Sequence, residues 1–314
     1  MEVPARRLPV PAFLSPEAQA TFGPLIAWPP MPAPDDVAGW KRYVADRDAA
    51  MAAALPEVPG AADHAQSRLR AGAANVFVLR PPGLAQDDRR VFLNLHGGAL
   101  VFGGGDITRR MGLMMAAVLG VETWALDYRM PPDHPYPAAL DDCLAAYRLL
   151  LEDRAPGEII VGGASAGGNL AAALVLRARD EGLPLPAAAI LQTPEADLTE
   201  SGDSFATLMG VDRGLSSLMP VNRLYANGAD LAHPYLSPLF GDFAPGFPPS
   251  FLSTGTRDLY LSNTVRLHAA LRAADVPADL HVLDGASHMG FPRSPEVAAL
   301  QRQMRRFAEA HWQA

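Results

Sequence analysis

The sequence contains one cysteine, Cys143, among its 314 residues. An intramolecular disulfide is therefore excluded, and such low cysteine usage is typical of proteins from a reducing compartment. No cysteine and histidine residues stand at metal-ligand spacing, so we expect no metal. The glycine run 103–105 does not fit the G-x-G-x-x-G pattern, and we expect no dinucleotide or other cofactor.

Long apolar runs are also missing. No stretch of the sequence is long enough to cross a bilayer, so we expect no membrane partner. Near the N-terminus, Pro9, Pro11 and Pro16 interrupt the region where a secretion signal would place its apolar segment. These two observations predict a cytoplasmic protein.

Positive charge is scarce. The chain has 26 Lys and Arg residues against 34 Asp and Glu residues, which gives a net charge of −8. Nucleic-acid binding needs a basic surface, so we expect no nucleic-acid partner. The one dense basic cluster, residues 302–306, is predicted to lie on the solvated face of a C-terminal helix.

What the sequence does have is a regular alternation of strand and helix patterns. Strands are expected at 67–70, 75–79, 91–95, 122–126, 159–161, 188–192, 251–254 and 279–283, and helices at 36–55, 108–119, 137–151, 169–177, 262–273 and 295–312. Such an order predicts an α/β fold with a mostly parallel sheet covered by helices on both faces. Ligands in these folds bind beyond the carboxyl ends of the strands.

Two segments stand outside this alternation. Residues 1–60 are rich in Pro and Ala but too apolar for a free tail, and they fit a lid over a pocket and a plain core segment equally well. Residues 198–233 are an apolar helical insertion that would roof a site above the strand ends. We therefore predict an N-terminal cap segment at 1–60 and a catalytic domain at 61–314 that contains the inserted cap region 198–233.

The motif with the clearest chemistry is G-x-S-x-G at Gly163, Ser165 and Gly167, between an apolar strand and an Ala/Leu-rich helix. In such a sharp turn the serine backbone is strained and its hydroxyl stands clear of the sheet, facing the helix N-terminus. This favours an acyl-transfer nucleophile. The alternative is a Gly-rich turn in which Ser165 only caps the helix.

A base and an orienting acid are expected after other strands. His288 follows the last predicted strand, and Asp258 follows the strand at 251–254. The order Ser165, Asp258, His288 is the nucleophile–acid–base order of α/β-hydrolases. Asp284 is nearer to His288 in the sequence and competes with Asp258 for the role of the acid.

A source of oxyanion donors is expected after the strand at 91–95. There Gly97, Gly98 and Ala99 are small enough to turn backbone amides toward a substrate oxygen. Their neighbour His96 is predicted to organise this loop and not to act as a base. Candidate pocket walls, each of which would also fit an ordinary core position, are Leu100, Phe102, Leu215, Leu218 and Met289.

At this point the chain resembles the bacterial hormone-sensitive-lipase family of α/β-hydrolases, which are carboxylesterases. The matching segments are His96-Gly97-Gly98-Ala99, Asp127-Tyr128-Arg129 with the run 134–139, the stretch 163–169, Asp258-Leu259, and His288 with Phe291. The resemblance implies a serine esterase on an α/β-hydrolase fold, with an N-terminal and an inserted helical cap. It also implies that the amides of Gly98, Ala99 and Ala166 form the oxyanion hole.

Two residues depart from the family pattern. Ala99 replaces the third glycine of the oxyanion motif, and a left-handed backbone there would cost about 1 kcal/mol. Ala164 replaces the acid that precedes the serine, so the contact of that acid is lost. Neither change removes a catalytic group, but both bear on substrate preference.

The sequence thus predicts a serine carboxylesterase that hydrolyses short- to medium-chain acyl esters, or lactones, of small molecules. Two alternatives stay open. The same triad could act on amides, as an arylformamidase does, or the fold could serve as a non-catalytic small-molecule receptor. The sequence does not decide between a monomer and a homodimer.

Overall fold

The computed structural model describes residues 7–288 and 290–313. Within them lies one eight-stranded sheet with the strand order β1-β2-β4-β3-β5-β6-β7-β8. Its strands are β1 Ala65–Ala71, β2 Ala74–Arg80, β3 Val91–Leu95, β4 Glu122–Asp127, β5 Ile159–Ala164, β6 Ala188–Gln192, β7 Ser250–Gly255 and β8 Ala278–Leu283. Only β2 pairs antiparallel, with β1 and with β4, and the other neighbours are parallel. The predicted mostly parallel α/β sheet is confirmed.

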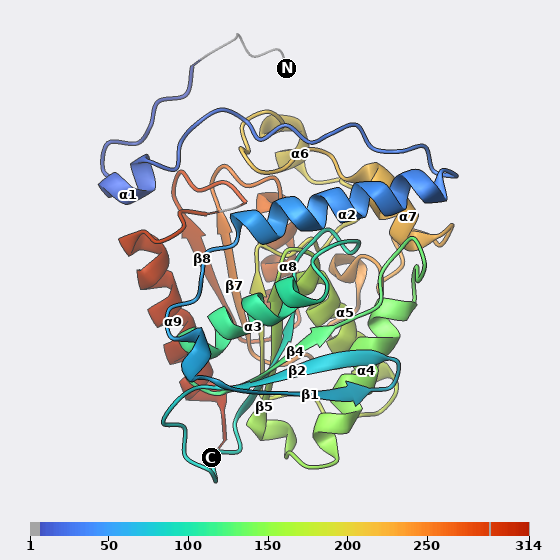
Figure 1. Cartoon of the computed structure of the whole chain (residues 1–314), viewed down its shortest axis with the longest axis vertical. Helices are drawn as coiled ribbons and strands as arrows, with labels where there is room; N and C mark the ends of the chain where they lie inside the picture. Colours follow the sequence, from blue (N-terminus) through green and yellow to red (C-terminus); the bar gives the residue numbers. More distant parts are fainter. Residues whose placement is uncertain (1–6, 289, 314) are drawn as a thin grey trace.

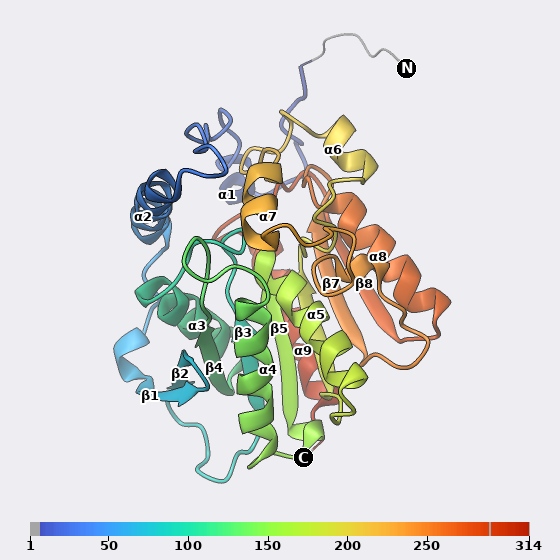
Figure 2. The same ribbon diagram turned by 90° about the vertical axis from the view of Figure 1, so that its right-hand side faces the viewer.

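Helices cover both faces of this sheet (Figures 1 and 2). The long helices are α2 Val37–Ala54, α3 Asp106–Leu119, α4 Ala138–Leu151, α5 Ala166–Asp180, α8 Leu261–Ala273 and α9 Pro295–His311. Two separate apolar clusters reveal the layers, one joining the sheet to α4, α5 and α8, the other joining it to α3 and α9. Ser294 caps α9, because its hydroxyl accepts from the Val297 N–H at 3.2 Å.

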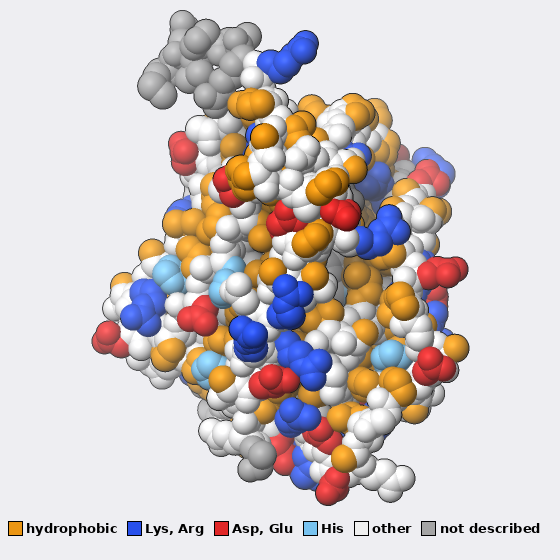
Figure 3. All heavy atoms as spheres, turned by 90° about the vertical axis from the view of Figure 1, so that its left-hand side faces the viewer, with side chains coloured by type: hydrophobic (Ala, Val, Ile, Leu, Met, Phe, Trp, Pro, Cys, Tyr) orange, Lys and Arg blue, Asp and Glu red, His pale blue; other side chains and the backbone are white. Residues whose placement is uncertain are grey.

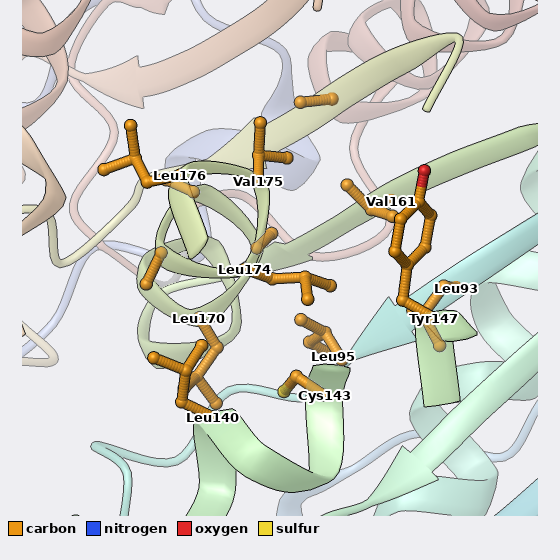
Figure 4. Packing of buried hydrophobic residues seen from close by; sticks show 14 of the residues in the cluster. Leu93, Leu95, Leu140, Cys143, Tyr147, Val161, Leu170, Leu174, Val175 and Leu176 are labelled. Carbon is orange, nitrogen blue, oxygen red and sulfur yellow. The ribbon is translucent and has the colours of Figure 1, made fainter. Parts of the chain in front are cut away.

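Alternation along the strands explains the two layers. In β3, Phe92 belongs to the α3/α9 cluster, whereas Leu93 and Leu95 belong to the α4/α5 cluster. Successive side chains of a strand point to opposite faces, so a continuous apolar run fills two cores. Figure 4 shows Cys143 of α4 between Leu95 of β3 and Leu170 of α5. The Cys143 side chain is fully buried there.

The segments outside the alternation lie over the carboxyl ends of the strands. In Figure 1, α2 runs across the top of the molecule above α3. Helix α2 begins at its N-cap Asp36, whose side chain accepts from Gly39 N–H at 2.7 Å. The insertion 198–233 contains the short helices α6 Asp203–Thr207 and α7 Met219–Ala226 joined by irregular chain. The division into cap and catalytic domain stays a prediction.

The surface has mixed charge. On the face seen in Figure 3, basic and acidic side chains are interspersed. The arginines of the basic cluster at 302–306 are exposed on α9, as predicted, and Arg305 pairs with Glu309 at 2.8 Å. Among the described residues, no helix has both the length and the apolar character needed to traverse a bilayer.

Candidate active site

The Ser165 turn connects β5 to α5 with little room to spare. Ser165 has φ 59° and ψ −122°, a backbone conformation that L residues rarely adopt. Its own N–H donates to the Gln192 carbonyl oxygen at 2.9 Å. A Cβ atom on Gly163 or Gly167 would stand 2.2 Å or 2.0 Å from the Leu95 carbonyl oxygen. Both glycines of the motif are therefore required by the close approach of β3.

His288 and Asp258 are brought together by the ends of β7 and β8. The ring Nδ1 of His288 lies 3.2 Å from the Asp258 carboxylate, which is itself 1% exposed. Asp258 also accepts from Thr254 Oγ1 at 2.9 Å and from Tyr260 N–H at 2.9 Å. The competitor Asp284 is exposed and accepts from Thr256 Oγ1 at 3.0 Å. The geometry thus favours Asp258 as the partner of the base.

Thr193, which the sequence reasoning missed, completes this pair. Its hydroxyl donates to the Asp258 carboxylate and lies 2.9 Å from Nδ1 of His288. A hydroxyl that donates to the acid can only accept from the imidazole, so both contacts favour a proton on Nδ1. Nε2 is then the free acceptor, which is the tautomer that a general base needs.

The charges around His288 favour its protonated form. Burial lowers the pKa of this imidazole, but the attraction and hydrogen bond of Asp258, with the charges of Asp212 and Glu195, more than reverse that effect. The net pKa is therefore raised above 6.5. Burial in turn raises the pKa of Asp258, and the contacts with His288 and Thr193 outweigh it, so this pKa is lowered. The arrangement suits a base that becomes an imidazolium beside a carboxylate.

Asp212 is a second residue that the sequence did not reveal. It lies in the insertion, is 1% exposed, and uses all its acceptor capacity on backbone N–H groups. One carboxylate oxygen accepts from Leu259 at 2.8 Å and His288 at 3.2 Å, and the other from Gly214 at 2.8 Å and Leu215 at 3.1 Å. A single side chain therefore ties the insertion to the loops that carry the acid and the base.

The loop after β3 places small residues against the nucleophile. A Cβ on Gly97 would lie 3.5 Å from Cβ of Ser165. Gly98 has φ 134° and Ala99 has φ 50°, so the left-handed backbone that the sequence raised as a cost is present at Ala99. The N–H groups of Gly97, Gly98 and Ala99 donate to nothing in the part of the chain that is described. As the first residue of α5, Ala166 has an N–H without an intrahelical acceptor.

His96 holds this loop in place. Its ring stacks on Tyr128 with centroids 4.0 Å apart, and the Tyr128 hydroxyl donates to the His96 carbonyl oxygen at 2.8 Å. Burial lowers the pKa of His96 to about 4, so the ring is neutral at physiological pH. These contacts are those of a structural organiser.

Ser165, His288 and the loop 97–99 open on one cavity of about 520 Å³. Of the predicted walls, Phe102, Leu215 and Leu218 line it. The prediction for Leu100 is wrong: its side chain is fully buried in the α4/α5 cluster. With φ 65°, Leu100 follows Ala99 through a left-handed turn that directs the two side chains to different sides of the loop. Met289 lies outside the described residues.

The remaining walls of this cavity come from the N-terminal segment with α2, from α3 and α9, and from the ends of β3 and β6. They are mainly apolar and include Trp28, Met51, Met111, Met114, Met115, Val118 and Met304, with Arg47, Asn94, Gln192 and Gln301 as polar members. A larger open hollow of about 1200 Å³ lies beside the N-terminal segment but includes neither Ser165 nor His288. No metal-binding group of His, Cys, Asp and Glu occurs in residues 7–288 or 290–313.

Comparison with known proteins agrees with this geometry. A family model described as the alpha/beta hydrolase fold matches residues 92–292. The solved structure of an esterase, E25, is 34% identical, covers 100% of this chain and 99% of its own, and superposes with a TM-score of 0.89. An esterase from the bacterial hormone-sensitive lipase family is 30% identical over 95% of this chain and 99% of its own, with a TM-score of 0.78.

Curated relatives found by sequence are also named as esterases or acetyl-hydrolases. An acetyl-hydrolase of Streptomyces hygroscopicus is 37% identical over 196 residues, which cover 62% of this chain and 65% of that relative. The esterase LipI of Mycobacterium tuberculosis is 31% identical over 222 residues, 67% of this chain and 69% of its own length. The match to the first of these relatives thus spans slightly less than two thirds of its length.

Proposed function

Because the chain belongs to the bacterial hormone-sensitive-lipase family of α/β-hydrolases, we propose that it is a serine carboxylesterase acting through an acyl-enzyme on Ser165. One observation carries this proposal. The strained Ser165 turn, the His288 imidazole and a loop with free N–H groups all border one apolar cavity, and Asp258 holds the imidazole from behind by a hydrogen bond. These are the parts that ester hydrolysis requires.

In the first half of the reaction, Nε2 of His288 accepts the Ser165 proton as Oγ forms a bond to the ester carbonyl carbon. The carbonyl oxygen becomes an oxyanion, which accepts hydrogen bonds from the N–H groups of Gly98, Ala99 and Ala166. The imidazolium then gives its proton to the leaving alcohol as the ester C–O bond breaks. Asp258 stabilises the imidazolium while it holds this proton.

In the second half, water attacks the acyl carbon of the ester on Ser165. His288 accepts a proton from this water, and the same three N–H groups hold the second oxyanion. When the bond to Oγ breaks, the proton returns to Ser165 and the carboxylic acid leaves.

The size and the walls of the cavity favour short- to medium-chain acyl esters as substrates. Lactones are a further substrate class that would fit it. Its volume of about 520 Å³ lies in the range of small-molecule sites, roughly 300–1,000 Å³. Several of its walls are methionines, which adapt their shape to flexible apolar chains.

The proposal is tested with p-nitrophenyl acetate, butyrate, octanoate and palmitate. We expect the highest kcat/KM for one of the first three, and we expect Ser165→Ala to reduce it by at least about 10⁴-fold. Ser67→Ala, at an exposed position of β1, is the matched control and should keep full activity. Retention of more than about a hundredth of the activity by Ser165→Ala would contradict the mechanism.

The two alternative functions are separated by further measurements on the same protein. An amidase would turn over p-nitroacetanilide at a rate comparable to that of p-nitrophenyl acetate. A receptor would bind esters without turnover and would leave a fluorophosphonate unreacted. We expect turnover of the ester well above that of the amide.

A further inference from the structure

Arg47 is the unusual residue of the cavity. It lies on α2, is half-buried, and lines the same hollow as Ser165 and His288. Its guanidinium carbon stands 4.5 Å from the centroid of the Trp28 ring and 5.9 Å from that of Phe102. Its buried Nε has no hydrogen-bond partner among the described residues. Within residues 7–288 and 290–313, Arg47 makes no ion pair.

The neighbours of Arg47 on α2 do not supply a counter-charge. The positions three and four residues away, which share its face of the helix, are Tyr43, Val44, Ala50 and Met51. The adjacent Asp48 forms no ion pair with Arg47, and its carboxylate accepts from the Gly103 N–H at 2.7 Å.

Two basic side chains near Arg47 have an ion-pair or hydrogen-bond acceptor of their own. Lys41, also on α2, pairs with Asp133 at 2.7 Å. Arg110, on α3, donates to the carbonyl oxygens at the end of α2, including that of Ala52 at 2.7 Å. These two cations therefore have acceptors within the described chain, whereas Arg47 has none there.

The other walls of the cavity do not supply an anion either. Apart from Ser165, the neutral His96 and the base His288, the described polar side chains that line it are the uncharged Asn94, Gln192 and Gln301. Stacking on Trp28 contributes about 0.5–2 kcal/mol, yet it leaves the guanidinium N–H donors free for a bidentate acceptor. A half-buried arginine of this type is suited to a carboxylate that enters with the substrate.

We propose that Arg47 makes this enzyme selective for esters that carry a negative charge, a carboxylate, in the acyl or the alcohol part. The carboxylate binds the guanidinium at the α2 wall while the ester carbonyl lies at Ser165. This inference rests on the proposed esterase function and specifies its substrate class. The protein as a whole has a net charge of −8, so the preference depends on this local cation and not on the overall field.

The test uses two pairs of substrates that differ in one charge. In the first pair, monomethyl adipate is compared with methyl heptanoate, so the charge is in the acyl part. In the second, 4-acetoxybenzoate is compared with its methyl ester, so the charge is in the alcohol part. The intrinsic reactivities differ within each pair, so the quantity of interest is the ratio of variant to wild-type kcat/KM for each member.

For at least one pair, we expect Arg47→Gln to lower kcat/KM about 10- to 100-fold for the charged member, as fits the loss of a charge-assisted hydrogen bond. The neutral member should change less than about threefold. Arg47→Lys should retain part of the preference, because it keeps the charge but not the planar fork. Arg42→Gln removes the same charge from an exposed position of α2, and it should change neither member.

Equal losses for charged and neutral members in both pairs would overturn the inference and leave Arg47 as a structural contact of Trp28. That result differs from failure of the esterase proposal, in which the wild type would hydrolyse neither member nor any p-nitrophenyl ester. If Arg47→Gln does not fold, the salt dependence of the wild-type enzyme tests the inference instead. Its preference for the charged member must fall as NaCl is raised, and a ratio independent of salt would contradict the proposal.

Discussion

Individual side chains at this site act mainly by fixing other groups. Thr193 and Asp258 set the tautomer of His288, and Asp212 fixes the backbone on which His288 stands. Asp212 also acts through its charge, because it is one of the groups that raise the pKa of the base. Its two effects, on geometry and on charge, can be separated by experiment.

The Asp212→Asn variant tests the effect of this charge. His288 must be neutral to accept the Ser165 proton, so kcat/KM falls as the pH drops through the raised pKa of His288. Removing the negative charge at residue 212 lowers that pKa, so the acid limb of the profile should move to lower pH. The plateau should also fall, since the asparagine NH₂ opposes backbone N–H groups.

The control for this variant is Asp203→Asn, at an exposed position of α6, which should leave the limb in place. A merely structural role of Asp212 would lower the plateau and leave the midpoint of the limb unchanged. An unmoved midpoint in an active Asp212→Asn enzyme would therefore contradict the electrostatic role assigned to this carboxylate.

At the residue scale, a local signal predicted the strained turn at Ser165, while the catalytic roles of the site residues stay predictions. The nucleophile turn is a short motif whose glycines are required by contact with Leu95. Thr193 directly follows β6 at the same sheet edge as Asp258, so the rule that found the acid could have found it. Asp212 lies in an irregular insertion and carries no such signal. Leu100 was misplaced because its direction depends on two successive left-handed residues.

Among the elements, the crossing of β3 and α5 limits what the active-site turn tolerates. Gly167→Ala should disrupt this crossing, because the added methyl would overlap the Leu95 carbonyl oxygen, which is backbone and cannot rotate away. We expect the free energy of unfolding to fall by about 1–3 kcal/mol and esterase activity to fall with it. Urea denaturation and turnover of p-nitrophenyl butyrate measure the two effects.

Gly23→Ala provides the comparison, because its Cβ would meet only the Arg213 side chain at 3.5 Å, an ordinary contact. The urea concentration at which half of the Gly23→Ala protein is unfolded should equal that of the wild type. A Gly167→Ala protein as stable and as active as Gly23→Ala would show that the turn is looser than described.

The bounds of helices and strands with a clear hydrophobic pattern were predictable to within a few residues. Helix α9 and its Ser294 cap follow from the Ser-Pro start, and β3 and β5 from short apolar runs before glycine. The antiparallel pairing of β2 with β4 could not be predicted, because pairing depends on contacts distant in sequence. The insertion 198–233 was expected to be more helical than the short α6 and α7.

For the whole molecule, the cavity depends on segments from opposite ends of the chain. Trp28 and α2 close one side, and the Trp28 indole N–H donates to the Gly214 carbonyl oxygen of the insertion at 2.9 Å. Gly214 in turn donates to Asp212, which accepts from Leu259 and His288, so three successive hydrogen bonds connect the N-terminal segment to the loops after β7 and β8. A lid and a core segment are therefore not exclusive descriptions of residues 24–55. Cytoplasmic location stays a prediction, and neither a monomer nor a homodimer is assigned.

The central claim is that Ser165 alone carries the acyl group, and one labelling measurement tests it most directly. The protein is treated with a fluorophosphonate, and residual esterase activity is followed together with the site and extent of labelling by peptide mass spectrometry. We predict one phosphonyl group per chain, on Ser165, with activity lost in proportion. Full labelling of Ser165 with activity retained, or loss of activity with the label on another residue, would contradict the account.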